Sequence, residues 1–246
     1  LAIQLAKKLN GEIINADSMQ IYKDFSILSS RPNNKETKKA KHHLYGIISV
    51  KKYFSAGDWL KLAKSKINQC HKTKKTPIIV GGTGLYFNTI TKGISKIPNI
   101  DIKTRSKVRT LFKKLGYKNF YEKLLDIDPK VKNRILPTDS QRTQRAYEVI
   151  LKTKKSLFDW TMNTKSDFIN FEIKKIFIDI PREELLKKIS QRTESMFKNK
   201  CMEEVKKFNS LKINKSLSAN KLIGVQEINA YLKGSIALDQ CKELIN

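Results

Sequence analysis

The chain of 246 residues is 39% hydrophobic and carries a formal net charge of +27. This length suits one large domain, or a core with a smaller lobe. No apolar stretch approaches the roughly 18 residues that a membrane-spanning helix needs, and no signal-peptide pattern is visible. The composition therefore excludes a membrane-spanning protein, and we expect no membrane partner.

The three cysteines are Cys70, Cys201 and Cys241. Their number is odd and their spacing is wide, which is typical neither of a disulfide framework nor of a zinc site. Because free thiols persist in a reducing compartment, we expect a cytoplasmic protein.

The positive charge has two explanations. It indicates a polyanionic partner such as nucleic acid. Codon bias in an A/T-rich genome would also enrich lysine, and only eight of the 50 basic residues are arginines. The arginines are therefore the more informative cations, because arginine rather than lysine makes bidentate contacts with anions.

The first elements alternate between helix and strand. Residues 1–10 have the apolar spacing of an amphipathic helix. Residues 12–16 form a short apolar run that follows Gly11, which is typical of a buried strand. Residues 29–43 are polar and predict a loop or a short helix.

A second helix and strand follow. Residues 53–72 predict a helix in which Ser55 and Asp58 form a capping box. Residues 77–80 predict a buried strand that ends in a glycine turn and a further helix. This alternation predicts an α/β fold, in which helices cover a parallel sheet.

The sequence changes character after residue 98. Residues 102–121 contain five lysines and two arginines but no acidic residue. Residues 173–182 again predict a strand that returns to the sheet, and residues 182–208 predict a charged helix. We therefore expect a core of residues 1–97 and 173–246, interrupted by a helical insertion at residues 98–172.

Asp17 follows the first predicted strand. Ligands of open α/β sheets bind beyond the carboxyl ends of the strands, so this is a common place for a catalytic carboxylate. Asp also caps turns frequently. Position alone leaves both roles open.

The turn Gly81-Gly82-Thr83-Gly84 follows the second predicted strand. Glycines let the backbone approach a ligand, and a hydroxyl at a helix start can contact phosphate. Strand-to-helix turns also use glycine for geometry alone. Together with Asp17 on a neighbouring strand, the turn becomes a candidate phosphate site that faces a candidate base.

Residues 136–149 contain a third candidate site. Asp139 is placed to cap a helix, and Arg142 and Arg145 are three residues apart on one face. Two arginines on one turn favour an anion contact, and a solvated pair is the alternative.

Eight stretches occur in order along the chain: "ADSMQIYKD", "KHHL", "YFSAGDWL", "IIVGGTGLYF", "ILPTDSQRTQRAYEV", "PREELLKKISQRTESMF", "EEV" and "KLIGVQEINAYLKG". In this order and at these separations, the chain resembles the bacterial tRNA dimethylallyltransferase family. That family prenylates an adenosine beside the anticodon. The resemblance covers essentially the whole chain.

The resemblance implies a P-loop-type α/β core of the ATP-binding kind, with a helical lobe that grips tRNA. It implies transfer of a dimethylallyl group from dimethylallyl diphosphate to N6 of the adenosine at tRNA position 37, by a monomer that uses Mg²⁺. Asp17 and Thr83 would be catalytic. The substrate-binding residues would be Ser18, Met19, Gln20, Tyr22, Lys23, Gly81, Gly82, Tyr86, Lys221, Gly224 and Gln226. The tRNA-binding residues would be Arg105, Asp139, Gln141, Arg142, Thr143, Gln144 and Arg145.

The family's phosphate loop, Gly-x-Thr-x-x-Gly-Lys-Ser or Thr, would precede Leu1, so the sequence assigns no metal ligand. We expect residues 1–246 alone to bind tRNA with little prenyl transfer. The chain departs from the family pattern at Val225, where many members have Tyr, and at Gln226, where many have Lys or Arg. Lys200 stands where glycine is usual. A P-loop small-molecule kinase and a non-catalytic RNA-binding relative remain the two alternatives.

Overall fold

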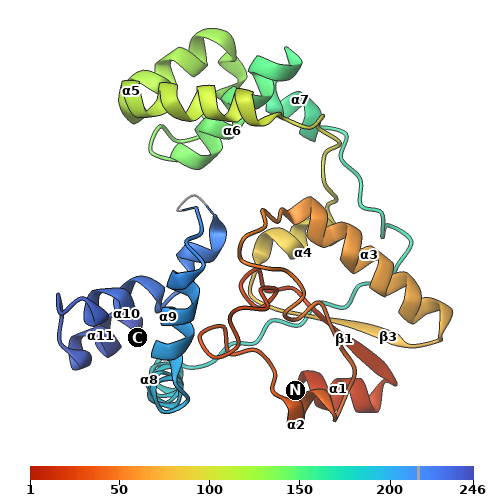
Figure 1. Cartoon of the computed structure of the whole chain (residues 1–246). Helices are drawn as coiled ribbons and strands as arrows, with labels where there is room; N and C mark the ends of the chain where they lie inside the picture. Colours follow the sequence, from red (N-terminus) through yellow and green to blue (C-terminus); the bar gives the residue numbers. More distant parts are fainter. Residues whose placement is uncertain (215–216) are drawn as a thin grey trace. The chain divides into compact units, whose positions relative to one another are not determined.

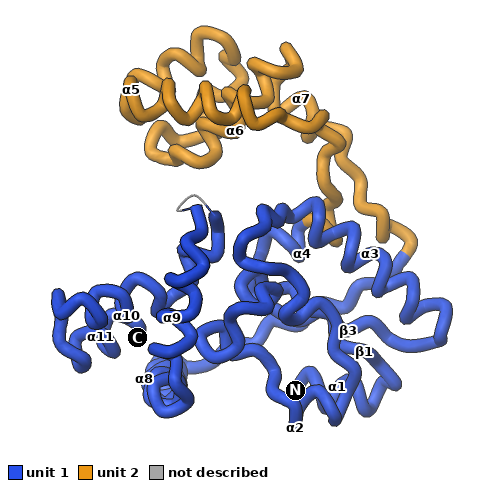
Figure 2. The backbone as a smooth tube through the Cα atoms, viewed as in Figure 1, with its two compact units in different colours: residues 1–88, 171–246 blue, residues 89–170 orange. Residues whose placement is uncertain are grey.

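The computed structural model describes residues 1–214 and 217–246, and it divides into two compact units. Unit 1 contains Leu1–Asn88 and Phe171–Asn246, and unit 2 contains Thr89–Asn170 (Figure 2). The insertion expected at residues 98–172 lies almost wholly in unit 2. No helix in the described part of the chain is both long enough and apolar enough to span a membrane.

The sheet of unit 1 is parallel, as predicted. Its central strand β1 (Gly11–Asn15) pairs on one side with β2 (His42–His43) and on the other with β3 (Thr76–Val80) (Figure 1). In β1 the four residues after Gly11 are buried, because both neighbours and the covering helices enclose it. The sequence did not predict β2, since two residues are too short to show a strand pattern.

Two helices pack on this sheet, α1 (Ala2–Lys8) and α3 (Ala56–Lys72). The predicted capping box of α3 is present, with Ser55 accepting from the Asp58 backbone and the Asp58 side chain accepting from the Ser55 backbone. The indole nitrogen of Trp59 donates to the Asn15 carbonyl at 2.8 Å. This bond fixes the start of α3 beside the carboxyl end of β1. The region predicted as loop or short helix contains the short helix α2 (Asn34–Thr37).

The strand predicted at residues 173–182 is wrong. Residues 172–181 have no regular secondary structure, and Ile176, Phe177 and Ile178 are 66%, 89% and 62% exposed. A strand needs a hydrogen-bonded neighbour, and the described residues provide none for this segment. The apolar pattern of residues 173–182 predicts a strand, but it does not show whether a neighbouring strand is present.

The charged helix predicted at residues 182–208 is two helices, α8 (Arg182–Lys198) and α9 (Cys201–Ser210). They are separated at Lys200, whose φ of 68° lies in the left-handed region. Glu204 of α9 accepts from the backbone nitrogens of Ser26, Ile27 and Leu28 at 2.6–3.0 Å. The helices are thereby joined to the loop that follows β1.

The rest of unit 1 is helical. It comprises η2 (Ser218–Lys221), α10 (Val225–Leu232) and α11 (Leu238–Ile245). All three cysteines are free and buried.

Unit 2 contains the long helix α5 (Ile102–Ile127), η1 (Pro129–Val131), α6 (Ser140–Thr153) and α7 (Leu157–Thr161). Helix α4 (Gly84–Thr91) crosses the boundary between the units. A non-helical residue, Gly116, kinks α5. The core of unit 2 is formed by Val108, Phe120, Tyr121, Leu124, Val131, Ile135, Ala146 and Tyr147.

Glu12 is a buried acidic residue of β1, only 5% exposed. Its carboxylate lies 2.6 Å from His43 Nε2 and 3.4 Å from Lys41 Nζ, and Cys70 Sγ is 3.8 Å away. Burial raises the pKa of the Glu12 carboxyl, but the His43 hydrogen bond and the Lys41 charge outweigh it and hold the pKa below its ordinary value. The ionised carboxylate therefore ties β1 to β2.

We predict that Glu12→Gln lowers the free energy of unfolding at pH 7 by about 1–3 kcal/mol. A carboxyl whose pKa is lowered by folding stabilises the protein above its unfolded pKa, and this contribution is lost as pH falls through the folded pKa. The difference between variant and wild type should therefore shrink below about pH 4.5. Urea unfolding at a series of pH values tests this, with the exposed Glu183→Gln as control. A difference that stays constant with pH would contradict the assignment.

Lys200→Gly should raise the free energy of unfolding by about 0.5–1 kcal/mol, because a side chain in the left-handed region is strained and glycine is not. The weak contact of Lys200 with Glu203, 3.8 Å and exposed, contributes little. The matched control is Lys206→Gly inside α9, where glycine should destabilise by about 1 kcal/mol. Thermal unfolding of the two variants gives the comparison, and destabilisation by both would refute the strain argument.

Candidate active site

The loops after β1 and β3 lie against each other. A Cβ on Gly81 would collide with the backbone of Ala16 and would lie 2.6 Å from the Asp17 nitrogen. The Thr83 backbone nitrogen donates to the Ala16 carbonyl at 3.2 Å. Only glycine fits this approach, so Gly81 brings the glycine turn beside Asp17.

Asp17 uses one carboxylate oxygen to shape its own loop. Its Oδ1 accepts from the backbone nitrogens of Met19 and Gln20 at 2.8 and 3.1 Å. Its Oδ2 lies 3.8 Å from the place where a Cβ on Gly82 would stand. The cap expected as the alternative role is therefore real. It occupies Oδ1 and leaves Oδ2 directed toward the glycine turn.

Thr83 connects the two loops through its side chain. Its Oγ1 accepts from the Ser18 backbone at 2.9 Å and donates to Ser18 Oγ at 3.2 Å. The structure thus brings Asp17, Ser18 and Thr83 together at the carboxyl edge of the sheet. The sequence predicted this group from two separate motifs, and their catalytic roles stay predictions.

Three tyrosines surround this edge. Burial, followed by the charge of Asp17, raises the pKa of Tyr45 to about 12. Burial also raises the pKa of Tyr22 and of Tyr86, and Tyr86 stacks on Trp59 with ring centroids 4.4 Å apart. All three phenols therefore stay protonated at neutral pH. Sequence reasoning missed Tyr45, although it directly follows the stretch "KHHL", because that stretch alone did not mark the next residue as part of the site.

Three further predicted substrate residues, Met19, Gln20 and Lys23, lie in the loop after β1. Gln20 Nε2 donates to the carbonyls of Ser29 and Ser30 at 2.9 and 3.1 Å. Lys23 is exposed, and its backbone nitrogen donates to the Ile48 carbonyl. Met19 is half-buried. The observed bonds of Gln20 give it a structural role, and contact with substrate remains a prediction for all three.

Lys221, Gly224 and Gln226 lie in the segment from η2 to α10. Lys221 and Gln226 are exposed. Gly224 has a φ of 97°, and a Cβ there would come within 2.7 Å of Leu28 Cδ2. The positive φ favours glycine at this position, because a side chain there would be strained. An approach of Lys221 to the Asp17 loop stays a prediction.

In unit 2, Asp139 caps α6, as expected. Its Oδ1 accepts from the Arg142 nitrogen at 3.0 Å, and Thr143 Oγ1 donates to the Asp139 carbonyl at 2.7 Å. Thr143 is fully buried. Gln144 Nε2 donates to the Ser140 carbonyl at 3.0 Å. These groups form the start of the helix, and contact of Asp139, Thr143 and Gln144 with tRNA stays a prediction.

The arginines of α6 differ in how they are held. The Arg142 side chain is 75% exposed, and its Nε lies 3.4 Å from Asp139 Oδ2. The Arg145 side chain is 38% exposed and pairs with the nearly buried Glu148 at 3.3 Å. Gln141 is exposed beside them, and Arg105 is half-buried on α5. The helix therefore presents one largely exposed guanidinium and one that is half-buried against Glu148.

Unit 1 is thus an α/β enzyme fold in which a carboxylate and a Gly-Gly-Thr turn meet at the carboxyl edge of a parallel sheet, a usual position for a ligand site. The family model described as IPP transferase matches residues 20–246. The tRNA dimethylallyltransferase of Pelagibacter ubique is 51% identical over 245 residues, which are 100% of this chain and 78% of that protein. That of Ehrlichia chaffeensis is 38% identical over 99% of this chain and 80% of its own length.

Two solved structures agree. The full-length tRNA isopentenylpyrophosphate transferase of Bacillus halodurans is 28% identical with a TM-score of 0.66, over 99% of this chain and 76% of that one. A eukaryotic dimethylallyltransferase acting on tRNA is 25% identical with a TM-score of 0.83, over 100% of this chain and 62% of that one. The chain belongs to the IPP transferase family and is a prenyltransferase enzyme. The kinase and the non-catalytic relative, the two alternatives from the sequence, are not favoured.

Replacing the two arginines of α6 separately should distinguish their roles. Arg142→Gln should weaken tRNA binding and lower the slope of log K against log salt by about one unit, because an exposed guanidinium suits a phosphate contact. Arg145→Gln should reduce affinity by an amount that varies between tRNAs. Glu148 holds the Arg145 guanidinium in one orientation, and a fixed orientation is what hydrogen bonding to a base edge requires. Filter binding at several salt concentrations measures both. Unchanged binding would assign the pair to the solvated face.

Proposed function

We propose that this chain transfers a dimethylallyl group from dimethylallyl diphosphate to N6 of the adenosine next to the anticodon of tRNA. The observation that carries the proposal is the half-used carboxylate of Asp17, whose Oδ1 caps the loop while Oδ2 is directed toward the Gly82 turn. Family membership supplies the reaction class. The proposed enzyme acts as a monomer in the cytoplasm.

The reaction has two requirements. The exocyclic amine of adenine is a weak nucleophile, because its lone pair is delocalised into the ring. As the N6–C1 bond forms and the C1–O bond to diphosphate breaks, a proton must leave N6. Asp17 Oδ2 would accept it, since a general base needs only hydrogen-bond reach of the proton. The bonds from Met19 and Gln20 to Oδ1 hold the carboxylate in one orientation.

The leaving diphosphate must be neutralised. The backbone of Gly81 and Gly82, the Thr83 hydroxyl and the Lys221 ammonium are the groups proposed to bind it. A bound Mg²⁺ would add charge to the leaving oxygens. The hydroxyls of Ser18 and Thr83 would offer oxygen ligands to this ion beside the substrate phosphates and waters, and Asp17 Oδ2 would keep its role as the base.

The phenols of Tyr45 and Tyr86 would complete the site. Because their pKa values are raised, they act as neutral hydrogen-bond donors rather than as bases. The ring of Tyr86 stacks on the buried ring of Trp59, which holds the phenol in one orientation. The target adenosine would be extruded from its stack, at a cost of a few kcal/mol.

The test is Asp17→Asn, which keeps an acceptor oxygen for the cap and removes the base. Single-turnover prenyl transfer should slow by roughly 10²- to 10⁴-fold, while tRNA affinity changes less than about tenfold. The matched control is Asp24→Asn, whose Oδ2 accepts from the Val50 nitrogen at 2.9 Å in the same loop region. If Asp17→Asn turned over at the wild-type rate, Asp17 would not be the base.

A further inference from the structure

Unit 1 contains a pocket at the start of α3, with a volume of about 300 Å³. Its apolar lining is Ile48, Phe54 and Leu62. This volume is at the lower end of the range for small-molecule sites, and the apolar lining is typical of them. No residue of this pocket has a role in the mechanism above.

The pocket lies next to the carboxyl edge of the sheet. Ile48 forms a parallel bridge with Tyr22. Asp58 lines the pocket and belongs to the first turn of α3. Beyond the effect of burial, the charge of Asp58 helps to raise the pKa of Tyr86, and Tyr53 helps to raise the pKa of Tyr22. Trp59, the residue after Asp58, donates to the Asn15 carbonyl at the carboxyl end of β1, so the start of α3 and the pocket lie beside the loop that carries Asp17.

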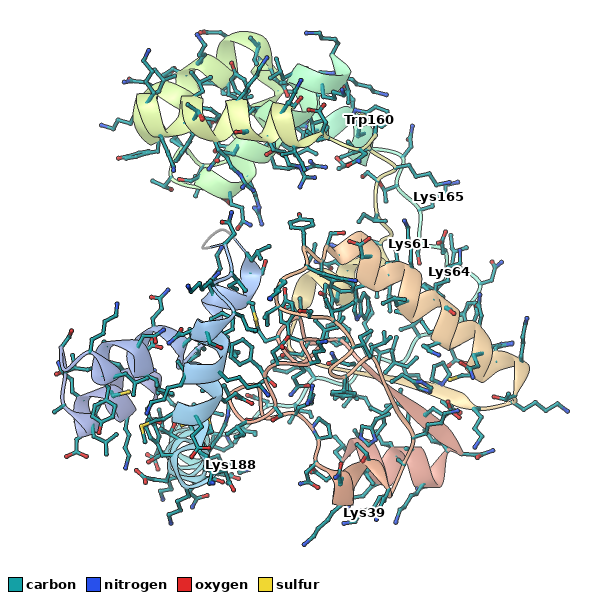
Figure 3. The ribbon with its side chains drawn as sticks, viewed as in Figure 1. Lys39, Lys61, Lys64, Trp160, Lys165 and Lys188 are labelled. Carbon is teal, nitrogen blue, oxygen red and sulfur yellow. The ribbon has the colours of Figure 1, made fainter. Side chains whose placement is uncertain are left out.

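The rim of the pocket is aromatic and basic. Tyr53 is 61% exposed, a large area for a ring. Lys52 and Lys61 also line the pocket and are exposed. Lys64 follows Lys61 by one turn of α3 on the same side of the helix (Figure 3). The only acid in the lining, Asp58, is bonded to Ser55 in the capping box, so positive charge dominates the rim.

A pocket whose lining combines an exposed aromatic ring, apolar side chains and exposed lysines fits the chemistry of a nucleotide. A base stacks on the ring, and the adjoining phosphate is neutralised by the ammonium groups. An uncharged lipid or an apolar peptide would leave the lysines without a counter-charge. An acidic peptide would not use the ring face.

We propose that this pocket binds one unstacked nucleotide of the tRNA anticodon loop, with its base against Tyr53 and its phosphate between Lys52 and Lys61. The inference rests on the proposed function, which supplies a tRNA loop at this edge. It adds a positioning subsite outside unit 2 and outside the catalytic loops. Because every base has a stacking face, the subsite would tolerate different tRNA sequences.

The ring is tested by Tyr53→Leu against Tyr53→Phe, with tRNA affinity measured by fluorescence anisotropy without prenyl donor. Tyr53→Leu keeps apolar volume but loses the stacking face, so affinity should fall about 5- to 100-fold. Tyr53→Phe keeps the ring, so its tRNA affinity should equal that of wild type. Equal affinity of Tyr53→Leu and wild type, or equal loss in both variants, would overturn the proposal.

The lysines are tested by Lys52→Gln/Lys61→Gln. The slope of log K against log salt should fall by about one unit, for one lost phosphate contact. Lys39→Gln is the control, because Lys39 is exposed near α2, away from α3 (Figure 3). An equal change in the control would mean that only the overall charge matters and would overturn the site. Circular dichroism confirms that each variant is folded.

A kinetic experiment separates this inference from the proposed function. Tyr53→Leu should raise KM for tRNA and leave KM for dimethylallyl diphosphate at the wild-type value. A rise in the diphosphate KM instead would place the donor in this pocket and refute the nucleotide assignment. If a protein that also carries the family's phosphate loop bound tRNA in a ring-dependent way but transferred no prenyl group, the proposed function would fail and the subsite would stand.

Discussion

The close approach of two loops is the constraint on which the site depends. Gly81 touches the backbone of Ala16 and Asp17 so closely that no side chain fits between them. Thr83 then bonds to Ala16 and Ser18 across the same gap. Because β1 and β3 are adjacent and parallel, their carboxyl ends are at one edge and the loops must meet there. Everything proposed for catalysis starts from this contact.

Acidic residues are scarce in a chain of charge +27, and the structure gives many of them several partners. Glu12 connects β1 to β2, and Glu204 accepts hydrogen bonds from three backbone nitrogens. Asp58 belongs to the capping box of α3, and Asp139 caps α6. Asp17 combines a cap with a second oxygen directed at the glycine turn. Excess lysine is then left on the surface, where it suits a polyanionic substrate. Most of the acids named here thus hold the architecture together, and the excess of lysine is compatible with a polyanionic substrate.

Lys200 illustrates how a local irregularity positions distant parts of a motif. Its left-handed φ ends α8 and reorients α9, so that Glu204 can accept from the loop after β1. Arg192 of α8 donates to the Leu28 carbonyl of the same loop at 3.0 Å. Arg192 and Glu204 therefore connect helices α8 and α9 to the loop after β1. Glycine, usual here in the family that the chain resembles, would make the same turn without strain.

The sequence by itself determined the parallel α/β core, the capping box of α3, the Asp139 cap of α6 and the pairing of Asp17 with the Gly-Gly-Thr turn. These depend on short-range patterns, namely apolar runs, caps and glycine turns, which act within a few residues. Only the tertiary structure decided the rest. The segment at 173–181 has the pattern of a strand, but strands need a partner, and none of the described strands pairs with it. In the same way Tyr45, Glu204 and the Tyr53 pocket became visible only through neighbours far away in the chain, because contact between distant residues leaves no local pattern.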